Sequence, residues 1–241
     1  MNDPTWKTIG ILGGMGPEST AELYRKIIKI CQKEYACKYD SDFPPMFIYN
    51  MPLPDIVENK GDQCLIPEVI SNGLAILEGA GCDFIAVPCN TVFAYIGPAK
   101  CKLPLLNIVE ETSKYVIRRG INKIGVIATK NTVRNRLYEK YLENIDIIQL
   151  PSESQDEVND IIMRILSGEK TLRDKKCLQN FIEVLAAEGA EDVVLGCTEL
   201  PLLISQSDSK FFLIDTLQVL AEVTVEKARV SYDKGGGKDG A

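Results

Sequence analysis

The chain has 241 residues, a formal net charge of −7 and no histidine. The acidic excess argues against a nucleic-acid or anionic-membrane partner, because phosphate binding needs clustered Lys and Arg. No apolar run approaches the ~20 residues of a membrane span and no signal peptide is visible, so we expect a cytoplasmic location.

In chain order, short apolar runs alternate with amphipathic stretches, which predicts strands followed by helices. The predicted strands are Thr8–Leu12, Met46–Asn50, Phe84–Val87, Pro104–Ile108, Ile124–Ala128, Ile145–Leu150, Val193–Leu195 and Phe211–Ile214. The predicted helices are Glu18–Cys31, Pro67–Glu78, Glu110–Arg118, Val133–Glu143, Glu153–Leu166, Leu172–Glu188 and Thr216–Arg229. This alternation is typical of parallel sheets with right-handed crossovers.

The two halves of the chain resemble each other, which predicts two copies of one α/β unit. Cys82–Thr91 (C-D-F-I-A-V-P-C-N-T) aligns without a gap with Ala190–Glu199 (A-E-D-V-V-L-G-C-T-E), 108 positions later. Thr8–Leu12 likewise resembles Lys123–Ile127. The alternative is that unrelated α/β units look alike, because β-branched strands and glycine turns recur in all of them.

We therefore predict an α/β protein of two pseudo-symmetric small domains. Each is expected to be an open parallel sheet flanked by helices, with the active site in the interdomain cleft. Residues 1–106 and 217–232 are expected to form the first domain and 107–216 the second. The tail, 233–241, is rich in glycine and has no apolar anchor, so we expect it to be disordered.

Two of the eight cysteines, Cys89 and Cys197, occupy matching positions in the two halves. Both fall beyond the carboxyl ends of predicted strands, where parallel sheets bind ligands. A thiol on either side of one small substrate is what a two-base proton exchanger requires. The cysteines show no C-x-x-C pair and no zinc-like spacing, and the lack of histidine removes Ser-His and Cys-His nucleophiles and the usual metal sites.

A glycine-rich loop follows the first predicted strand, in the segment G-I-L-G-G-M-G-P (10–17). Its spacing matches neither the dinucleotide fingerprint nor the P-loop, and no Lys follows to hold phosphates. Adjacent glycines before a helix let backbone N–H groups bind a small anion, so a carboxylate fits the loop better than a phosphate. The alternative is a tight turn that needs positive φ.

Three motifs in this order resemble the aspartate/glutamate racemases, which work without pyridoxal phosphate. They are I-G-I-L-G-G-M-G-P-E-S-T-A near the start, P-C-N-T after the third strand and G-C-T-E-L-P near the end. The resemblance spans roughly 7–230 and is closest to the aspartate racemase branch, because Glu199 stands where glutamate racemases usually have His. It implies a cofactor-independent, metal-free isomerase that interconverts L- and D-amino acids.

The resemblance implies that one cysteine, as a thiolate, removes the α-proton while the other, as a thiol, protonates the opposite face. A free thiol titrates near ~8.5, so the thiolate needs nearby donors, and so does the negative charge that develops on the substrate. The implied catalytic pair is Cys89 and Cys197. The implied substrate-binding residues are Gly14, Met15, Asn50, Met51, Asn90, Thr91, Thr129, Thr132, Thr198 and Glu199. Alternatively, Asn90 and Thr91 could be ordinary helix caps, and Glu199 a solvated charge.

The chain departs from the aspartate-specific pattern at the positions expected to bind a side-chain carboxylate. Ile56 stands where the family has Arg and Leu166 where it has Lys, with Arg164 or Lys170 as candidate replacements. Phe93 stands in place of a family histidine. A buried carboxylate without a charged partner is costly, so a neutral or mixed substrate range is an open alternative, although aspartate and glutamate stay the best named substrates.

Two other functions stay open. One is another isomerase of the same superfamily, such as a hydantoin racemase, and the other is a catalytically inactive homologue that binds a small molecule. No motif predicts a metal, a nucleotide or another cofactor. The resemblance implies a homodimer, and the other expected partner is the amino-acid substrate, with no nucleic acid and no membrane.

Overall fold

The computed structural model describes residues 6–58, 60–97 and 101–230. Its strands are β1 (Ile9–Gly13), β2 (Met46–Asn50), β3 (Phe84–Val87), β4 (Leu105–Asn107), β5 (Lys123–Ile127), β6 (Asp146–Gln149), β7 (Asp192–Leu195) and β8 (Phe212–Asp215). Its α-helices are α1 (Pro17–Tyr35), α2 (Ile66–Gly79), α3 (Ile108–Arg118), α4 (Lys130–Arg134), α5 (Ser152–Leu166), α6 (Leu172–Ala187) and α7 (Thr216–Ala228). Its 3-10 helices are η1 (Asp40–Asp42), η2 (Gln63–Leu65), η3 (Thr91–Ala94), η4 (Leu200–Leu202) and η5 (Gln206–Asp208).

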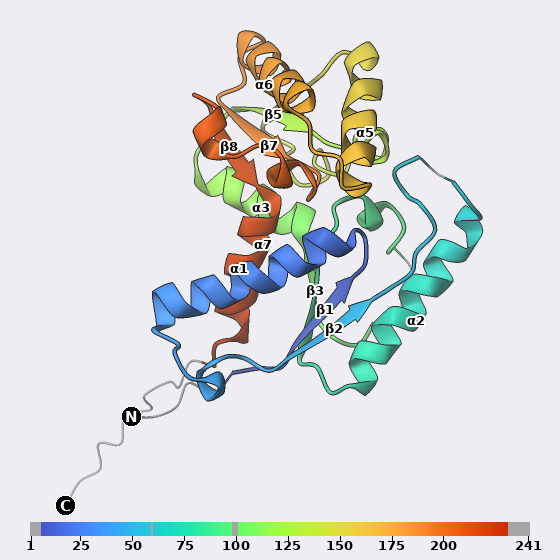
Figure 1. Ribbon diagram of the computed structural model, residues 1–241, viewed down its shortest axis with the longest axis vertical. Coiled ribbons are helices and arrows are strands. Elements are labelled where there is room, and N and C mark those ends of the chain that lie inside the picture. The colour runs from blue at the N-terminus through green and yellow to red at the C-terminus, as the bar shows by residue number, and fades with distance from the viewer. Residues whose placement is uncertain (1–5, 59, 98–100, 231–241) are drawn as a thin grey trace, which may run out of the picture.

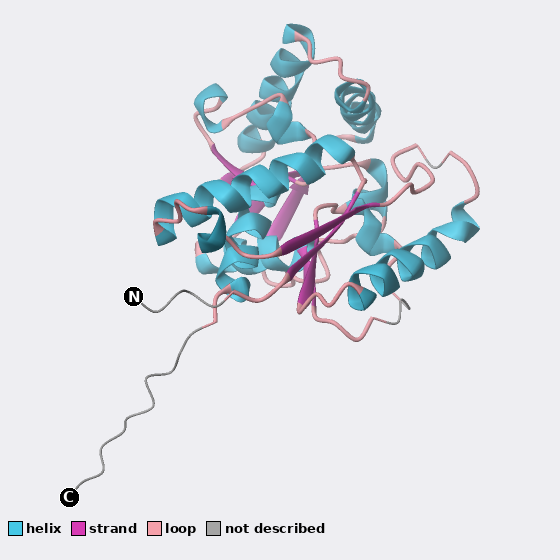
Figure 2. Cartoon of the chain, turned by 60° about the horizontal axis from the view of Figure 1, so that its bottom comes forward, coloured by secondary structure: helices cyan, strands magenta, loops and turns pink. Residues whose placement is uncertain are grey.

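The strands form two four-stranded parallel sheets with the same order of connections. The first sheet runs β2-β1-β3-β4 and the second β6-β5-β7-β8. Helices flank both sheets, and the first sheet lies below the second in Figure 1. The cartoon in Figure 2 shows β2 at the outer edge of the first sheet. These features confirm the predicted α/β fold of two similar open parallel sheets.

The central strand of each sheet lies between two parallel neighbours. In β1, Ile9, Ile11 and Leu12 are fully buried, as expected for a strand that helices cover on both faces. Because the strands are parallel, their carboxyl ends meet at one edge of the sheet. The loops that follow β1 and β3 therefore lie together, and so do the loops that follow β5 and β7.

Helix α7 ties the two halves of the chain together. Asp215 caps its start, since Oδ1 accepts hydrogen bonds from the N–H groups of Leu217 and Gln218. The helix packs against α1 and α3, and Lys26 of α1 forms an ion pair with Asp215 (Nζ–Oδ2 3.0 Å). Its apolar residues belong to a buried cluster that also contains residues of both sheets, so the halves share one core.

The prediction of a helix over Val133–Glu143 is wrong. Helix α4 ends at Arg134, and turns follow it. Arg136 adopts the left-handed conformation (φ 51°), its N–H donates to the carbonyl of Val133, and the N–H of Leu137 donates to the carbonyl of Thr132. This is the Schellman arrangement that terminates many helices, here built on an arginine where glycine is usual. The end of α4 was therefore not predicted, because no glycine marks it in the sequence.

The two sheets do not by themselves define domain boundaries. The assignment of 1–106 and 217–232 to one domain and of 107–216 to the other stays a prediction. The predicted disordered tail, 233–241, lies outside the described residues. No helix in the described part of the chain is both long and apolar enough to cross a lipid bilayer.

Candidate active site

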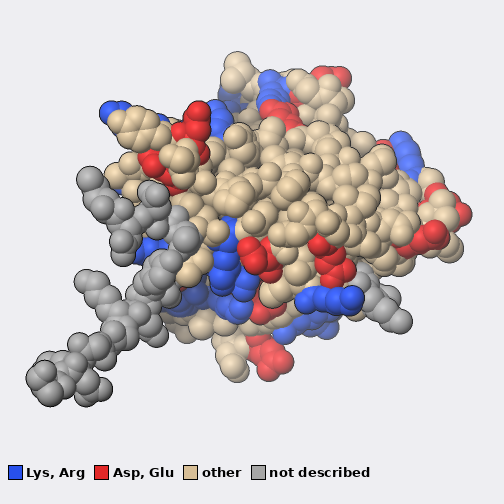
Figure 3. Space-filling view, turned by 90° about the horizontal axis from the view of Figure 1, so that it is seen from below, with Lys and Arg blue, Asp and Glu red and all other residues tan. Residues whose placement is uncertain are grey.

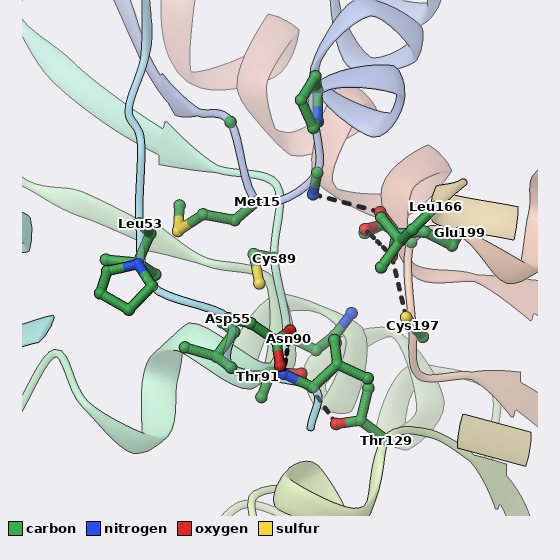
Figure 4. Close-up of a pocket in the computed structure, with 17 residues that line it drawn as sticks. Met15, Leu53, Asp55, Cys89, Asn90, Thr91, Thr129, Leu166, Cys197 and Glu199 are labelled. Carbon is green, nitrogen blue, oxygen red and sulfur yellow. Dashed lines mark hydrogen bonds between the residues drawn. The ribbon is translucent and has the colours of Figure 1, made fainter. Parts of the chain in front are cut away.

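One cavity of about 240 Å³ takes its lining from both halves of the chain (Figure 4). It lies where the loops after the central strands of the two sheets meet. Pockets for drug-sized molecules run from about 300 to 1,000 Å³, so this cavity suits a smaller ligand. Its lining comes from residues 14–17, 53–57, 89–91, 129, 166 and 197–199.

Both cysteines singled out by the sequence line this cavity. Cys89 follows β3 and Cys197 follows β7, and Figure 4 shows their side chains on different sides of the same space. Each residue is nearly buried, with exposed fractions of 6% for Cys89 and 5% for Cys197. The fold therefore brings two thiols from equivalent loops to one small site.

The surroundings of both thiols favour the protonated form. Burial, followed by the nearby charge of Glu199, raises the pKa of Cys89 to about 12, although the N–H groups of Val92 and Thr91 oppose this rise. Burial, the same carboxylate charge and a hydrogen bond to it raise the pKa of Cys197 well above its ordinary value. Both cysteines are therefore thiols at neutral pH, and a positive charge beside them would lower both pKa values.

Glu199 is the centre of a polar network between the two halves. Its Oε2 accepts hydrogen bonds from Sγ of Cys197 (2.9 Å) and from the hydroxyl of Thr198 (3.1 Å). Its Oε1 accepts from the hydroxyl of Ser19 (2.8 Å) and from the N–H of Gly16 (3.2 Å). Glu199 is only 5% exposed, so the alternative of a solvated surface charge does not describe it.

The glycine-rich loop passes along one side of the cavity. Gly14 has φ +93°, and a Cβ on it would lie 2.4 Å from the backbone oxygen of Met51. The position therefore needs glycine both for its conformation and for space, as the turn interpretation expects. The N–H of Gly14 donates to Oγ1 of Thr20 (2.9 Å) and that of Gly16 donates to Glu199. Among these described loop residues, Met15 is the one whose N–H stays available to a ligand.

Three threonine hydroxyls form a closed triangle at the junction of the halves. Oγ1 of Thr91 lies 2.9 Å from Oγ1 of Thr129 and 3.2 Å from Oγ1 of Thr132, and Thr129 and Thr132 are 3.1 Å apart. All three residues are buried, but Thr91 and Thr129 line the cavity and Thr132 lies behind them. The triangle joins the Cys89 loop to the start of α4.

Asn90 and Thr198, the residues that follow the two cysteines, each form side-chain hydrogen bonds to the other half of the chain. Asn90 is 1% exposed and makes no side-chain capping bond to η3, so the helix-cap alternative does not hold for it. Its amide instead bonds to Tyr138 and Thr216. The hydroxyl of Thr198 lies 3.5 Å from the carbonyl oxygen of Pro88. Both residues line the cavity.

Three of the predicted substrate-binding residues lie outside the lining. Asn50 ends the edge strand β2 and is exposed. Met51 is 1% exposed and packs into the apolar cluster between the first sheet and α2. Thr132 contacts the site only through the other two hydroxyls of its triangle. Direct substrate contact is therefore expected of the other predicted residues and not of these three.

The loop over residues 53–57 also lines the cavity, although none of its residues was among the predicted substrate-binding residues. It is held over the cavity by the second half, since Nδ2 of Asn131 donates to the carbonyl of Ile56 (2.6 Å) and Nδ2 of Asn159 to that of Val57 (3.4 Å). Leu166 also lines the cavity, against Gly16. The family resemblance had already marked Ile56 and Leu166 as unusual positions.

The lining, all of it within the described residues, contains no Lys or Arg. Its charged members are Asp55 and Glu199, which are both acidic. Arg164 is paired with Asp174 and Glu157, and neither it nor Lys170 lines the cavity. The described part of the chain also has no group of three or more His, Cys, Asp or Glu residues placed to hold a metal ion.

Comparison with known proteins shows the family to which the chain belongs. The Asp/Glu/Hydantoin racemase family model matches residues 12–224. The broad specificity amino-acid racemase RacX of Bacillus subtilis (strain 168) is 34% identical over 220 residues, which are 90% of this chain and 96% of that protein.

Two solved structures have the same fold. The aspartate racemase of Picrophilus torridus aligns with a TM-score of 0.80 at 27% identity, covering 92% of this chain and 94% of that one. An aspartate racemase homologue from Pyrococcus horikoshii OT3 aligns with a TM-score of 0.74 at 29% identity, covering 92% and 99%. The chain therefore belongs to the Asp/Glu/Hydantoin racemase family and is a racemase, an isomerase.

Proposed function

We propose that the protein racemises amino acids by moving the α-proton between Cys89 and Cys197. The observation that carries this proposal is that equivalent loops of the two halves bring two nearly buried thiols to one small cavity. One thiolate takes the α-proton and becomes a thiol, and the opposite thiol gives its proton to the other face of Cα and becomes a thiolate. Each turnover inverts the substrate and exchanges the two roles, with no net change in protons.

The first thiolate must form in a site that raises the pKa of both cysteines. Glu199 accepts the hydrogen bond from Sγ of Cys197, so its carboxylate is placed to take that proton. The α-ammonium group of an amino acid adds a positive charge, which favours a nearby thiolate. At Cys89, the N–H groups of Thr91 and Val92 partly offset the rise in pKa that burial causes, so they favour the thiolate of this cysteine.

Loss of the α-proton leaves negative charge that spreads onto the substrate carboxylate. Hydrogen-bond donors that already point at the carboxylate stabilise this charge, because they do not have to reorient during the reaction. The cavity offers the N–H of Met15 and the amide of Asn90 as donors. The hydroxyls of Thr91, Thr129 and Thr198 also line it, but they already form hydrogen bonds within the protein and would have to exchange them for bonds to the substrate. No cofactor is needed for this step, since the two thiols and these donors supply the proton transfer and the charge stabilisation.

We further propose that the preferred substrate carries no side-chain carboxylate. A second carboxylate would lose its hydration in the cavity and would meet Asp55 and Glu199 instead of a cation. Leu53, Ile56 and Leu166 offer an apolar surface in its place. The similarity to a broad specificity amino-acid racemase supports a substrate range that is not restricted to aspartate and glutamate.

Incubation of the protein with single L-amino acids in D2O tests both proposals. Neutral amino acids should gain α-deuterium and D-enantiomer together, measured by NMR and chiral chromatography, and aspartate and glutamate should react more slowly. Cys89→Ala and Cys197→Ala should each abolish turnover. Near wild-type turnover in both variants would falsify the two-thiol mechanism, and turnover of aspartate alone would overturn the substrate proposal.

We also propose that the protein is a cytoplasmic homodimer. β2 is an edge strand whose five residues (M-F-I-Y-N) carry no charge, and its Phe47 and Ile48 are 46% and 45% exposed. Unprotected edges of this kind favour association between copies of a chain. The face in Figure 3 also shows a broad area without Lys, Arg, Asp or Glu.

Light scattering measures the mass of the particle in solution and tests this proposal. The wild type should have twice the chain mass, and Ile48→Lys should have the mass of one chain. A wild type with the mass of one chain would overturn the dimer.

A further inference from the structure

A buried chain of hydrogen bonds joins Tyr138 to the backbone just before Cys197. Oη of Tyr138 donates to Oδ1 of Asn90 (2.8 Å), and Nδ2 of Asn90 donates to Oγ1 of Thr216 (3.3 Å). Oγ1 of Thr216 donates to the carbonyl oxygen of Leu195 (3.2 Å). All three side chains are at most 1% exposed, so water does not compete for these bonds.

The backbone carbonyl at the end of this chain fixes the direction of every bond in it. A carbonyl oxygen only accepts, so Thr216 must spend its single hydroxyl hydrogen on Leu195. Thr216 can then only accept from Asn90, which requires the NH2 end of the amide. The oxygen end of Asn90 must therefore face Tyr138, and Tyr138 must donate. Burial raises the pKa of Tyr138 far above its ordinary value, so its donor hydrogen is retained at any pH at which the protein functions.

This direction decides what Asn90 presents to the cavity. The amide oxygen is occupied by Tyr138, and one of the two Nδ2 hydrogens goes to Thr216. The second Nδ2 hydrogen is a donor on a residue that lines the cavity, and Figure 4 shows the nitrogen end of Asn90 on the side of Cys197. A donor suits the carboxylate of an amino acid, whereas the reversed amide would place an acceptor oxygen against it.

We propose that Tyr138 and Thr216 are positioning residues that hold the Asn90 amide with its N–H toward the substrate carboxylate. This role rests on the proposed racemase function. Neither residue touches the cavity, so each acts only through Asn90. Tyr138 lies in the turns that follow the early end of α4, and Thr216 is the first residue of α7. Two distant segments thus set the orientation of the residue that follows Cys89.

Substitutions that remove single hydroxyls test this role. Tyr138→Phe and Thr216→Val should each lower kcat/KM for L-alanine by about two- to tenfold, as expected for one lost hydrogen bond. Thr216→Ser keeps the hydroxyl and should stay close to wild type. In an Asn90→Ala background, Tyr138→Phe should have no further effect on kcat/KM. An equal effect in both backgrounds would mean that Tyr138 acts on stability alone, and the proposal would fail.

A second readout does not depend on turnover. In protein labelled with 15N-asparagine, the side-chain NH2 signals of Asn90 can be assigned by their loss in Asn90→Asp. Tyr138→Phe and Thr216→Val should shift or broaden these signals, and Thr216→Ser should not. Unchanged signals in both of the first two variants overturn the positioning role. If no amino acid is racemised but the signals shift, the proposed function fails while the fixed amide orientation stands.

Discussion

The thiol of Cys197 donates a 2.9 Å hydrogen bond to the carboxylate of Glu199, two residues further along the chain. The charge of this carboxylate raises the pKa of Cys197 and also that of Cys89. Glu199 therefore has two opposed effects on the site. It disfavours the thiolate form of both cysteines, and it also offers an acceptor for the proton that Cys197 must lose.

Glu199→Gln separates these two effects, because it removes the charge and keeps the size of the side chain. The pKa of both thiols should fall, so labelling of Cys89 and Cys197 by iodoacetamide at pH 8 should become faster, by about tenfold for each unit of decrease in pKa. Racemisation should become slower by about 100-fold or more, because the proton acceptor beside Cys197 is lost. Peptide mass spectrometry measures the labelling of each cysteine.

Glu18→Gln is the matched control for this change. Glu18 is an exposed residue at the start of α1 and does not line the cavity. Neither labelling nor turnover should change in this variant. If labelling of Cys89 and Cys197 stays at the wild-type rate in Glu199→Gln, the carboxylate charge does not control the thiols and this account of the site is wrong.

The raised pKa of Cys89 also predicts how stability depends on pH. The thiol titrates near ~8.5 in the unfolded chain and at about 12 in the folded protein, so above pH 8.5 the unfolded state loses its proton first. The stability contribution is thus complete below pH 8.5 and is lost as pH rises toward 12. Between pH 8 and pH 10 this one thiol should reduce the free energy of unfolding by up to about 2 kcal/mol.

Urea unfolding at the two pH values, under reducing conditions, measures this loss. Cys89→Ser has no thiol to titrate, so its free energy of unfolding should fall less between pH 8 and pH 10 than that of the wild type. Cys64→Ser changes an exposed cysteine outside the cavity and should behave as the wild type. An identical pH dependence in Cys89→Ser and the wild type would show that burial does not hold Cys89 as a thiol.

The substrate proposal predicts the effect of a cation in the cavity lining. Leu166→Lys places an ammonium group at the mouth of the site, where the side chain is 39% exposed and can keep its charge. The ratio of kcat/KM for aspartate to that for alanine should rise by about tenfold or more, as expected for a hydrogen bond to a charged group. Leu166→Met keeps the lining neutral and should leave the ratio unchanged. If Leu166→Lys and the wild type have the same ratio, the substrate side chain does not lie beside residue 166.

The sequence predicted the strands to within one residue at each end, and for the inner strands β1, β3, β5 and β7 the physical reason is burial. Parallel strands covered on both faces appear as continuous apolar runs, bounded here by glycine, proline and asparagine. The same regularity made the repeat visible and placed Cys89 and Cys197 at equivalent strand ends. For these features, local sequence and tertiary structure agree.

Other features depend on contacts that no local pattern reveals. The end of α4 at Arg134 depends on a left-handed Arg136, although arginine is a good helix former. The hydrogen bond between Tyr138 and Asn90 joins residues 48 positions apart. The loop over residues 53–57 covers the cavity because Asn131 holds it from the other half. Long-range contacts of this kind decide the shape of the site, which is why the cysteines could be predicted and much of the lining could not.

The glycine-rich loop gives a prediction about stability that does not depend on the reaction. Gly14→Ala forces a Cβ to within 2.4 Å of the backbone oxygen of Met51 at φ +93°, a conformation unfavourable for alanine. The free energy of unfolding should fall by about 2 kcal/mol or more. Gly79→Ala is the control, since a Cβ at this last residue of α2 would meet nothing within 4 Å.

Gly79→Ala should leave stability unchanged or raise it by about 0.5–1 kcal/mol, because alanine loses less conformational freedom on entering a helix. Urea unfolding of the two variants at pH 7 measures the difference. If Gly14→Ala is as stable as Gly79→Ala, the backbone of the loop does not pass as close to Met51 as described. Equal stability would also mean that the left-handed backbone at Gly14 costs alanine nothing, so the position would not need glycine for stability.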